Sequence, residues 1–194
     1  TVLEGRVLRC EDGVFTADPL KDSALAAGLP VYQPPRMKDP QAYEQMAALT
    51  PDLALLAFVT DIVPGRVLAV PKLGSICYHP SILPKYRGAS AINWAVINGE
   101  RETGLTIFWV DEGIDTGDIL LQKKVEIGPN ETTGELYFNK LYQLGVDACL
   151  EAVALIAQGK APRIPQDHSL ATYDPPCDEK VAARVCARFN SEGK

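Results

Sequence analysis

The chain has 194 residues with a formal net charge of −6, and 46% of them are hydrophobic and 23% charged. This composition predicts an ordinary globular protein of one domain, and the negative charge disfavours a broad nucleic-acid-binding face. No apolar run approaches the ~20 residues that a membrane-spanning helix needs. Five cysteines without a CxxC pair indicate neither a disulfide framework nor a zinc site, so we expect a cytoplasmic protein without a metal.

Predicted helices and strands alternate along the chain. A helix is expected over 41–49, and another begins after Ser90 and closes at Gly99. The longest helix should run from Thr132, which can form a capping box with Glu135, to Gly159. Strands are expected at 13–16, 52–59, 74–79, 104–110 and 119–127. The alternation predicts an α/β fold with a doubly wound, mostly parallel sheet.

The tail differs from the rest of the chain. From Ala161 it contains four prolines, and it ends in a charged segment over 178–194. We therefore expect an α/β domain over residues 1–160 and a proline-containing C-terminal arm over 161–194, with the remainder of a second domain absent.

His79 is the first candidate for chemistry. Pro80 cannot continue a central strand, so His79 should stand at the carboxyl end of the strand over 74–79. The next predicted strand ends in DEGIDTGD, residues 111–118, here named the aspartate turn. Ligands bind outside the carboxyl ends of strands in open α/β sheets, so His79 and one aspartate could form an acid/base pair. The alternative is that His79 caps a loop and the aspartates only form turns.

Two long motifs resemble a known family. HPSILPKYRGASAINW and, after it, DEGIDTGDILLQ are similar to the formyltransferases that use 10-formyltetrahydrofolate. In that family a histidine precedes an S-[LI]-L-P-x-x-R-G loop and an L/I-D-T-G-D aspartate follows, as His79 and Asp115 do here. The resemblance runs from about Asp52 to Tyr173. It is strongest to the N-terminal hydrolase domain of 10-formyltetrahydrofolate dehydrogenase, and it implies a Rossmann-like domain.

The resemblance also implies roles for individual residues. His79 would donate to the formyl oxygen or shuttle its proton, and Asp115 would hold the imidazolium and accept a proton from the nucleophile. Cys77 takes the catalytic position where transferases usually carry an asparagine donor, which favours the hydrolase branch. The implied substrate-binding residues are Ser81, Leu83, Pro84, Arg87 and Gly88 in the motif loop (residues 81–88), Phe58 and Ile62 as a pterin wall, and Val110, Glu112, Gly113 and Ile114 at the pterin edge.

The formyl acceptor stays open. Water would make the protein a hydrolase, whereas an amino sugar nucleotide or methionyl-tRNA would make it a transferase. A folate-binding module without catalysis is a further alternative, although binding alone would not need both His79 and Asp115. A dinucleotide site is the weakest alternative, because the chain has no G-x-G-x-x-G. The expected partner is the small folate, with neither a nucleic acid nor a membrane, and the oligomeric state is left undetermined.

Overall fold

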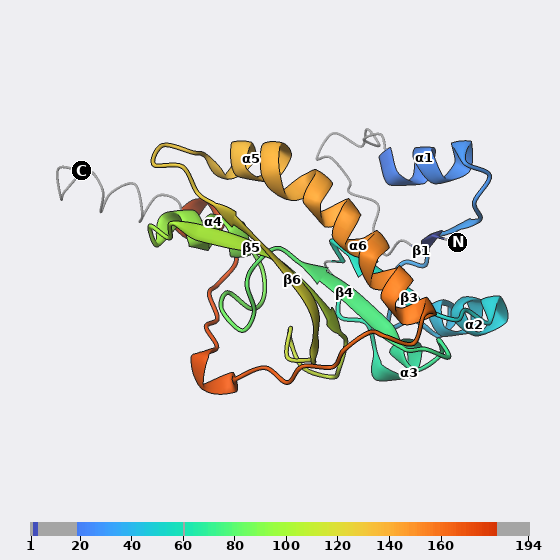
Figure 1. Cartoon of the computed structure of the whole chain (residues 1–194). Coiled ribbons are helices and arrows are strands. Elements are labelled where there is room, and N and C mark those ends of the chain that lie inside the picture. Colours follow the sequence, from blue (N-terminus) through green and yellow to red (C-terminus); the bar gives the residue numbers. More distant parts are fainter. Residues whose placement is uncertain (1, 4–18, 60, 182–194) are drawn as a thin grey trace, which may run out of the picture. The chain divides into compact units, whose positions relative to one another are not determined.

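The computed structural model describes residues 2–3, 19–59 and 61–181 (Figure 1). The chain forms two compact units. Unit 1 comprises Thr1–Ala54 and Phe58–Ser75, and unit 2 comprises Leu55–Ala57 and Ile76–Lys194. The His79 motif, the aspartate turn and the C-terminal arm therefore all belong to unit 2.

Unit 1 combines short strands with helices in its described residues. β1 (Val2–Leu3) pairs in parallel with β2 (Val31–Tyr32). The helices are α1 (Pro19–Ala26), α2 (Pro40–Leu49) and α3 (Gly65–Leu68). α2 begins at a proline, which lacks only an N–H that the first helical turn leaves unpaired. It ends at Thr50, whose φ of 44° is left-handed.

Unit 2 is built on a sheet with the strand order β3-β4-β5-β6. Its strands are β3 (Ala54–Ala57), β4 (Ser75–His79), β5 (Glu102–Trp109) and β6 (Ile119–Glu126). The α/β class is confirmed, but β4 pairs antiparallel with β5, and β5 antiparallel with β6, where mostly parallel pairing was expected. β5 is buried along nearly its whole length. Such a run reports burial on both faces and not strand direction, which is why the sequence pattern misled.

Helices cover this sheet. α4 (Ala91–Ile97) lies between β4 and β5 in the chain, and α5 (Thr133–Leu136), the π-helix η1 (Tyr137–Leu141) and α6 (Tyr142–Ala157) follow β6. The predicted capping box is confirmed, because the Thr132 hydroxyl accepts from the Glu135 N–H while the Glu135 carboxylate accepts from the Thr132 N–H. α6 packs on β5 and β6 (Figure 1). The core includes fully buried Ile76, Leu105, Ile107, Leu120, Leu136 and Leu141.

The predicted elements agree with the observed ones to within a few residues. The helix expected over 41–49 is α2, and the strand expected over 52–59 is the shorter β3. The strand expected over 13–16 lies outside the described residues. In the part of the chain that the structure describes, no helix combines the length and hydropathy that crossing a membrane requires.

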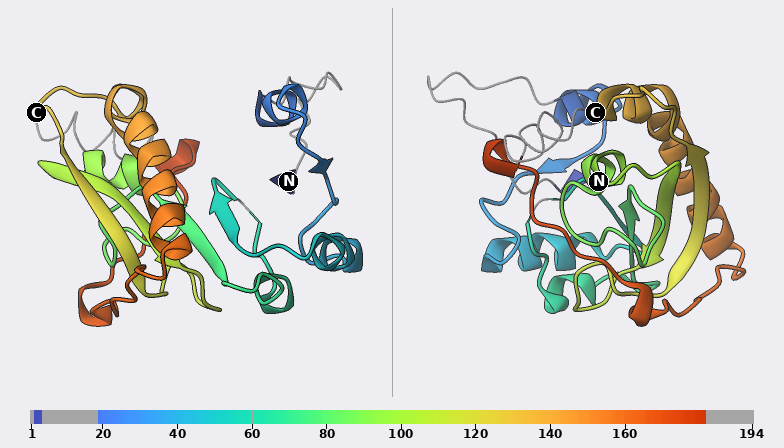
Figure 2. Two further views of the ribbon diagram at one scale, coloured as in Figure 1. Left: turned by 45° about the vertical axis from the view of Figure 1, so that its right-hand side comes forward. Right: turned by 90° about the vertical axis from the view of Figure 1, so that its left-hand side faces the viewer.

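The arm returns from α6 past the sheet to α4, as the red segment in Figures 1 and 2 shows. We name residues 161–177 the strap. Near its start, the Trp109 indole N–H donates to the carbonyl of Pro162 (2.9 Å), and Ile164 forms a β-bridge with Ile119. Near its end, the Trp94 indole N–H donates to the carbonyl of Pro175 (2.7 Å). Its short 3₁₀ helix η2 (His168–Leu170) lies between these anchors.

Candidate active site around His79 and Asp115

His79 is the last residue of β4, and it is only 6% exposed. Its Nε2 lies 2.7 Å from the carbonyl oxygen of Tyr86. A carbonyl only accepts hydrogen bonds, so Nε2 carries a proton in this geometry. Its Nδ1 lies 3.5 Å from Oδ2 of Asp115. Nδ1 is therefore the ring nitrogen that faces the carboxylate.

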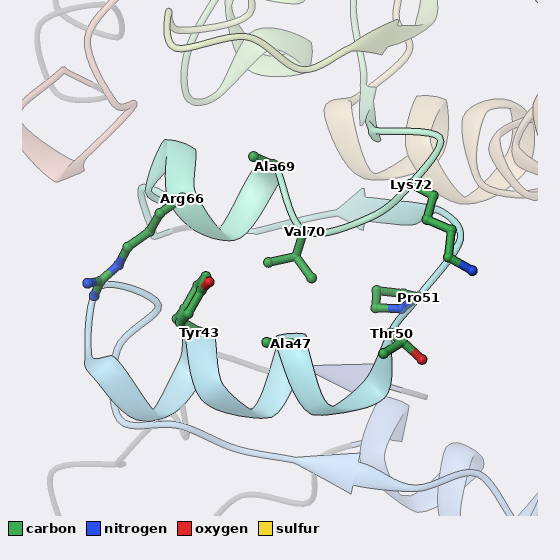
Figure 3. Close-up of a pocket in the computed structure, with 8 residues that line it drawn as sticks. All are labelled: Tyr43, Ala47, Thr50, Pro51, Arg66, Ala69, Val70 and Lys72. Carbon is green, nitrogen blue, oxygen red and sulfur yellow. The ribbon is translucent and has the colours of Figure 1, made fainter.

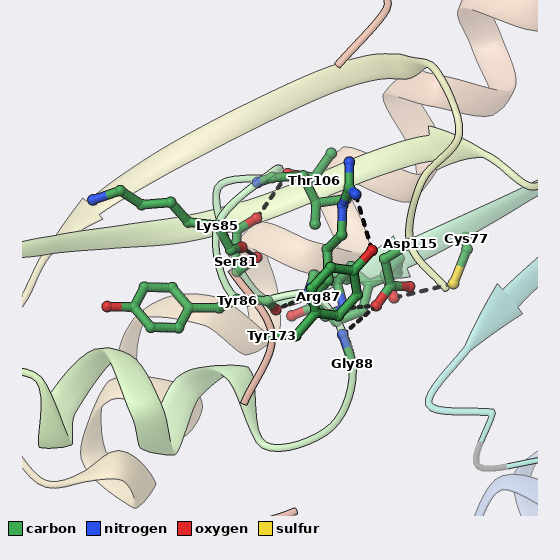
Figure 4. A network of polar contacts seen from close by, with 12 residues as sticks. Cys77, Ser81, Lys85, Tyr86, Arg87, Gly88, Thr106, Asp115 and Tyr173 are labelled. Atoms are coloured by element: carbon green, nitrogen blue, oxygen red, sulfur yellow. Dashed lines mark hydrogen bonds and ion pairs between the residues drawn. The ribbon is translucent and has the colours of Figure 1, made fainter. Parts of the chain in front are cut away.

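Asp115 is held in the aspartate turn by the backbone of that turn and of the motif loop. The turn closes where the Trp109 N–H donates to the Asp118 carbonyl (2.8 Å). Asp115 has a left-handed φ of 54°, a conformation that aspartate tolerates better than most side chains. Its Oδ2 accepts from the N–H of Gly88 at 2.7 Å (Figure 4). The same oxygen therefore faces both the motif loop and His79.

His79 and Asp115 were expected to lie close together, but the strand arrangement that brings them together differs from the predicted one. The prediction assumed that the carboxyl ends of two parallel strands lie side by side. β4 and β5 are antiparallel, and Trp109 at the end of β5 is opposite Ile76 near the start of β4. The aspartate turn must therefore run back along β4 for Asp115 to reach His79. Gly117 permits this path, because a Cβ there would run into the carbonyl oxygen of Trp109.

Burial controls the protonation of His79. Loss of water lowers the pKa of its ring from the ordinary 6.5, while Asp115 and the Tyr86 carbonyl act in the opposite direction. A neutral ring with its proton on Nε2 presents a lone pair at Nδ1. This lone pair and the Asp115 carboxylate then face each other as two acceptors. The pair can accept a proton from a third group and hold it beside a negative charge.

Cys77 lies two residues before His79 on the same strand. Burial, with a smaller contribution from Asp115, raises the pKa of its thiol to about 12. The thiol donates to the carbonyl of Tyr78 at 3.4 Å. Because the thiolate is the reactive form of cysteine, Cys77 is not suited to act as a nucleophile at neutral pH.

Some side chains of the predicted substrate loop are buried and bonded to neighbouring backbone groups. The fully buried Ser81 donates to the Lys85 carbonyl (2.6 Å), and its own carbonyl accepts from the Thr106 hydroxyl (2.7 Å). Leu83 is 2% exposed, and the Leu83–Pro84 peptide bond is cis. The geometry favours a loop-stabilising role for the Ser81 and Leu83 side chains, whereas Pro84 and Gly88 stay partly exposed.

Arg87, which the sequence suggested as a substrate anchor, is instead held by the strap. It is 3% exposed and donates to Gln166 Oε1 through Nε (3.2 Å) and Nη2 (2.6 Å). It also donates to the Tyr173 hydroxyl (3.0 Å) and to Nδ1 of His168 (3.0 Å). Figure 4 shows its guanidinium beside the Tyr173 ring. Gln166 lies within the stretch that resembles the family, but the sequence assigned it no role.

The other predicted binding residues divide between the two units. Val110 is partly buried, while Glu112, Gly113 and Ile114 are exposed in the aspartate turn of unit 2. Phe58 (61% exposed) and Ile62 (81% exposed) belong to unit 1.

Unit 1 also contains an open pocket of about 410 Å³ that the sequence did not indicate (Figure 3). α2 and α3 line it with Tyr43, Ala47 and Arg66, and its other lining residues include Val70. Arg66 donates to the carbonyl of Lys38 and lies over the Tyr43 ring. Across the described residues of both units, no cluster of three or more His, Cys, Asp or Glu side chains is arranged to hold a metal ion.

Comparison with known proteins extends over most of the chain. Residues 6–153 match the family described as formyl transferase. The cytosolic 10-formyltetrahydrofolate dehydrogenase of Xenopus tropicalis is 47% identical over 175 residues, covering 84% of this chain and 19% of that protein. The methionyl-tRNA formyltransferase of Syntrophus aciditrophicus (strain SB) is 48% identical over 161 residues, covering 83% of this chain and 51% of that protein. The chain thus spans about a fifth of the length of the dehydrogenase and about half of the length of the methionyl-tRNA formyltransferase.

A solved structure agrees with this relationship. The crystal structure of the formyltransferase PseJ from Anoxybacillus kamchatkensis, in complex with UDP-4,6-dideoxy-4-formamido-L-AltNAc and tetrahydrofolate, matches with a TM-score of 0.68 at 25% identity. The match covers 94% of this chain and 89% of that one, and it confirms the expected Rossmann-like α/β fold. With the family match spanning residues 6–153 and relatives at 47% and 48% identity, the chain belongs to the formyl transferase family.

Proposed function

We propose that this chain removes the formyl group of 10-formyltetrahydrofolate through His79 and Asp115 and releases it to water as formate. One observation carries the proposal: Nδ1 of the buried His79 lies 3.5 Å from Oδ2 of Asp115 in a chain of this family. The 47% identity to a 10-formyltetrahydrofolate dehydrogenase supports this formyl donor.

The reaction begins with addition of a water oxygen to the formyl carbon. One water proton passes to Nδ1 of His79, because Nε2 already donates to the Tyr86 carbonyl. The formyl oxygen becomes an oxyanion, and the imidazolium N–H at Nδ1 can stabilise it. Asp115 stabilises the imidazolium by its charge. The C–N10 bond then breaks, N10 receives the proton, and formic acid leaves and ionises.

The folate would bind beside this pair. Pro84 and Gly88 of the motif loop, together with Val110 and residues 112–114 of the aspartate turn, offer partly or fully exposed groups in unit 2. Phe58 and Ile62, which belong to unit 1, are exposed apolar side chains whose pterin contact is proposed from the family resemblance alone. Cys77 would act as a small neutral side chain beside the site. The reaction as written requires no metal.

The proposal includes the domain division and the setting. Residues 1–160 form the formyltransferase-type domain and residues 161–194 its arm. The identity to a dehydrogenase named cytosolic supports a cytoplasmic location, with the folate as partner and neither a nucleic acid nor a membrane.

Formyl transfer to an amine is the second candidate function. The 48% identity to a methionyl-tRNA formyltransferase supports it, as does the fold of PseJ, whose complex contains a formamido sugar nucleotide. In that reaction the amine nitrogen replaces the water oxygen, and the pair accepts its proton.

Loss of 10-formyltetrahydrofolate without an added acceptor separates these possibilities. The hydrolase proposal predicts steady, equimolar release of formate and tetrahydrofolate. Turnover that requires an amino sugar nucleotide or charged initiator tRNA would establish the transferase instead. Saturable binding of 5-formyltetrahydrofolate without turnover would indicate a binding module. No binding by a folded sample would overturn the proposal.

A further inference from the structure

We propose that Gln166, on the strap, is a positioning residue that holds Asp115 against His79. This inference rests on the function proposed above, and it adds a residue to which the sequence assigned no role. It also makes the strap a working part of the active site.

The Gln166 amide joins two parts of the site. Its Nε2 donates to the backbone carbonyls of Asp115 (2.9 Å) and Gly117 (2.7 Å), which lie within the aspartate turn. Its Oε1 accepts both hydrogen bonds from Arg87, at the end of the motif loop. One side chain therefore fixes the distance between the turn that carries Asp115 and the loop that follows His79.

Burial indicates that these bonds matter. Within residues 161–181, Gln166 is the one buried residue, at 6% exposure. Surface straps are more simply anchored by an apolar side chain, because a buried amide must have all of its hydrogen bonds replaced. Both donors and the acceptor of Gln166 have partners here. A fully satisfied buried polar group specifies one geometry more strictly than apolar contact does.

Three consecutive residues complete the connection. The carbonyl of Tyr86 accepts from His79, the side chain of Arg87 bonds to Gln166, and the N–H of Gly88 donates to Asp115. His79 and Asp115 are thus tied to neighbouring peptide groups, and Gln166 clamps the residue between them. Release of Gln166 should let the turn move relative to the ring without removing either reacting side chain.

The backbone conformation of Asp115 explains why the aspartate turn needs such a constraint. Its left-handed backbone is a conformation that few side chains occupy without surrounding constraint. The Gln166 bond to the Asp115 carbonyl supplies such a constraint. A displacement of about 1 Å at a reacting group can lower a rate about 10²-fold.

Two substitutions test the clamp. Gln166→Glu keeps an acceptor for Arg87 but loses both donors to the turn, and Gln166→Met loses all of these bonds at similar length. Both should lower kcat by about 10- to 100-fold while 5-formyltetrahydrofolate affinity stays within about threefold. Gln143→Glu is the matched control, because Gln143 is exposed on α6 and its amide donates to Asp147, away from the aspartate turn and the motif loop. It should retain the wild-type kcat.

A double-mutant comparison separates positioning from general support. If Gln166 acts through Asp115, Gln166→Glu should slow the Asp115→Asn variant by less than about threefold. Full multiplication of the two losses would overturn the proposal, as would a wild-type kcat in Gln166→Glu. If Gln166→Met does not fold, Gln166→Glu alone decides.

An NMR titration of His79 needs no turnover, so it also separates failure of this inference from failure of the proposed function. Asp115 raises the pKa of His79, so a displaced carboxylate should leave that pKa lower. Gln166→Met should therefore lower the His79 pKa in the wild-type background and leave it unchanged in Asp115→Asn. The chain has two histidines, which makes the signals assignable. An unchanged His79 pKa in Gln166→Met would refute the clamp even if the wild type showed no activity.

Discussion

Asp115→Asn isolates the charge of the proposed pair. Asparagine has nearly the same shape, and its amide oxygen can still accept the hydrogen bond that Gly88 donates at 2.7 Å. The hydrogen bond from the Gln166 side-chain amide to the backbone carbonyl of Asp115 is untouched. The substitution therefore removes the negative charge beside His79 while it leaves the aspartate turn in place.

The size of the effect follows from the distance. Two unit charges separated by the 3.5 Å between Nδ1 and Oδ2 attract by about 5 kcal/mol at an effective dielectric constant of about 20. Asp115 is 17% exposed at its side chain, so water screens part of this attraction and 5 kcal/mol is a ceiling. We expect about 3–4 kcal/mol of lost transition-state stabilisation, which is a fall in kcat of about 10²–10³-fold.

The assay is steady-state formate release from 10-formyltetrahydrofolate, with 5-formyltetrahydrofolate affinity and thermal stability measured on the same samples. The loss should fall on kcat, because the imidazolium that Asp115 stabilises exists only during the reaction. Folate affinity should change by less than about threefold. A kcat within about threefold of wild type, in a folded variant, would show that the Asp115 charge takes no part in the reaction.

Three other predictions follow from the site. Because burial lowers the pKa of His79, the ring stays neutral and kcat should keep its plateau below pH 6.5. For the same reason the unfolded chain binds a proton at His79 before the folded chain does, so the free energy of unfolding should fall as the pH drops below 6.5. Denaturant titrations will measure this dependence, which His79→Gln should reduce. Since burial raises the Cys77 pKa to about 12, iodoacetamide at pH 8 should spare Cys77 in the folded chain and label it in urea, as peptide mass spectrometry will detect. Cys77→Asn should keep the fold and retain or gain formyl transfer to amines, as an assay with an added amine acceptor will measure. Gly117→Ala should lower the free energy of unfolding by about 1–3 kcal/mol and reduce kcat, because its Cβ meets a backbone carbonyl, whereas Gly134→Ala, with open space at its Cβ, should do neither.

The elements that local chemistry defines were predictable. The capping box at Thr132 and Glu135 depends on residues three apart, and it marked the start of the long helix. Short apolar runs predicted β3, β4 and β5, and in β4 and β5 this pattern reflects burial on both faces. Strand direction left no such mark, so the antiparallel pairing of β4 with β5 was missed.

The candidate site was predictable only where a motif described it. His79 and Asp115 were chosen from the motifs, and the structure brings them within 3.5 Å, although their catalytic role stays a prediction. Gln166 bonds to Arg87 across 79 positions and stands alone as a buried polar residue in an exposed segment. A single residue has no periodicity, so neither hydrophobic pattern nor spacing could identify it.

A single-turnover experiment with His79→Ala examines the proposed chemistry itself. Excess protein is mixed with 10-formyltetrahydrofolate that carries an isotopic label in the formyl group, and labelled formate is followed with time. The proposed roles of His79 in proton transfer and oxyanion stabilisation predict a rate about 10³-fold or more below wild type, with 5-formyltetrahydrofolate affinity within about threefold. A folded His79→Ala variant that releases formate at nearly the wild-type rate would place the chemistry elsewhere and leave the motif loop as a folate-binding element only.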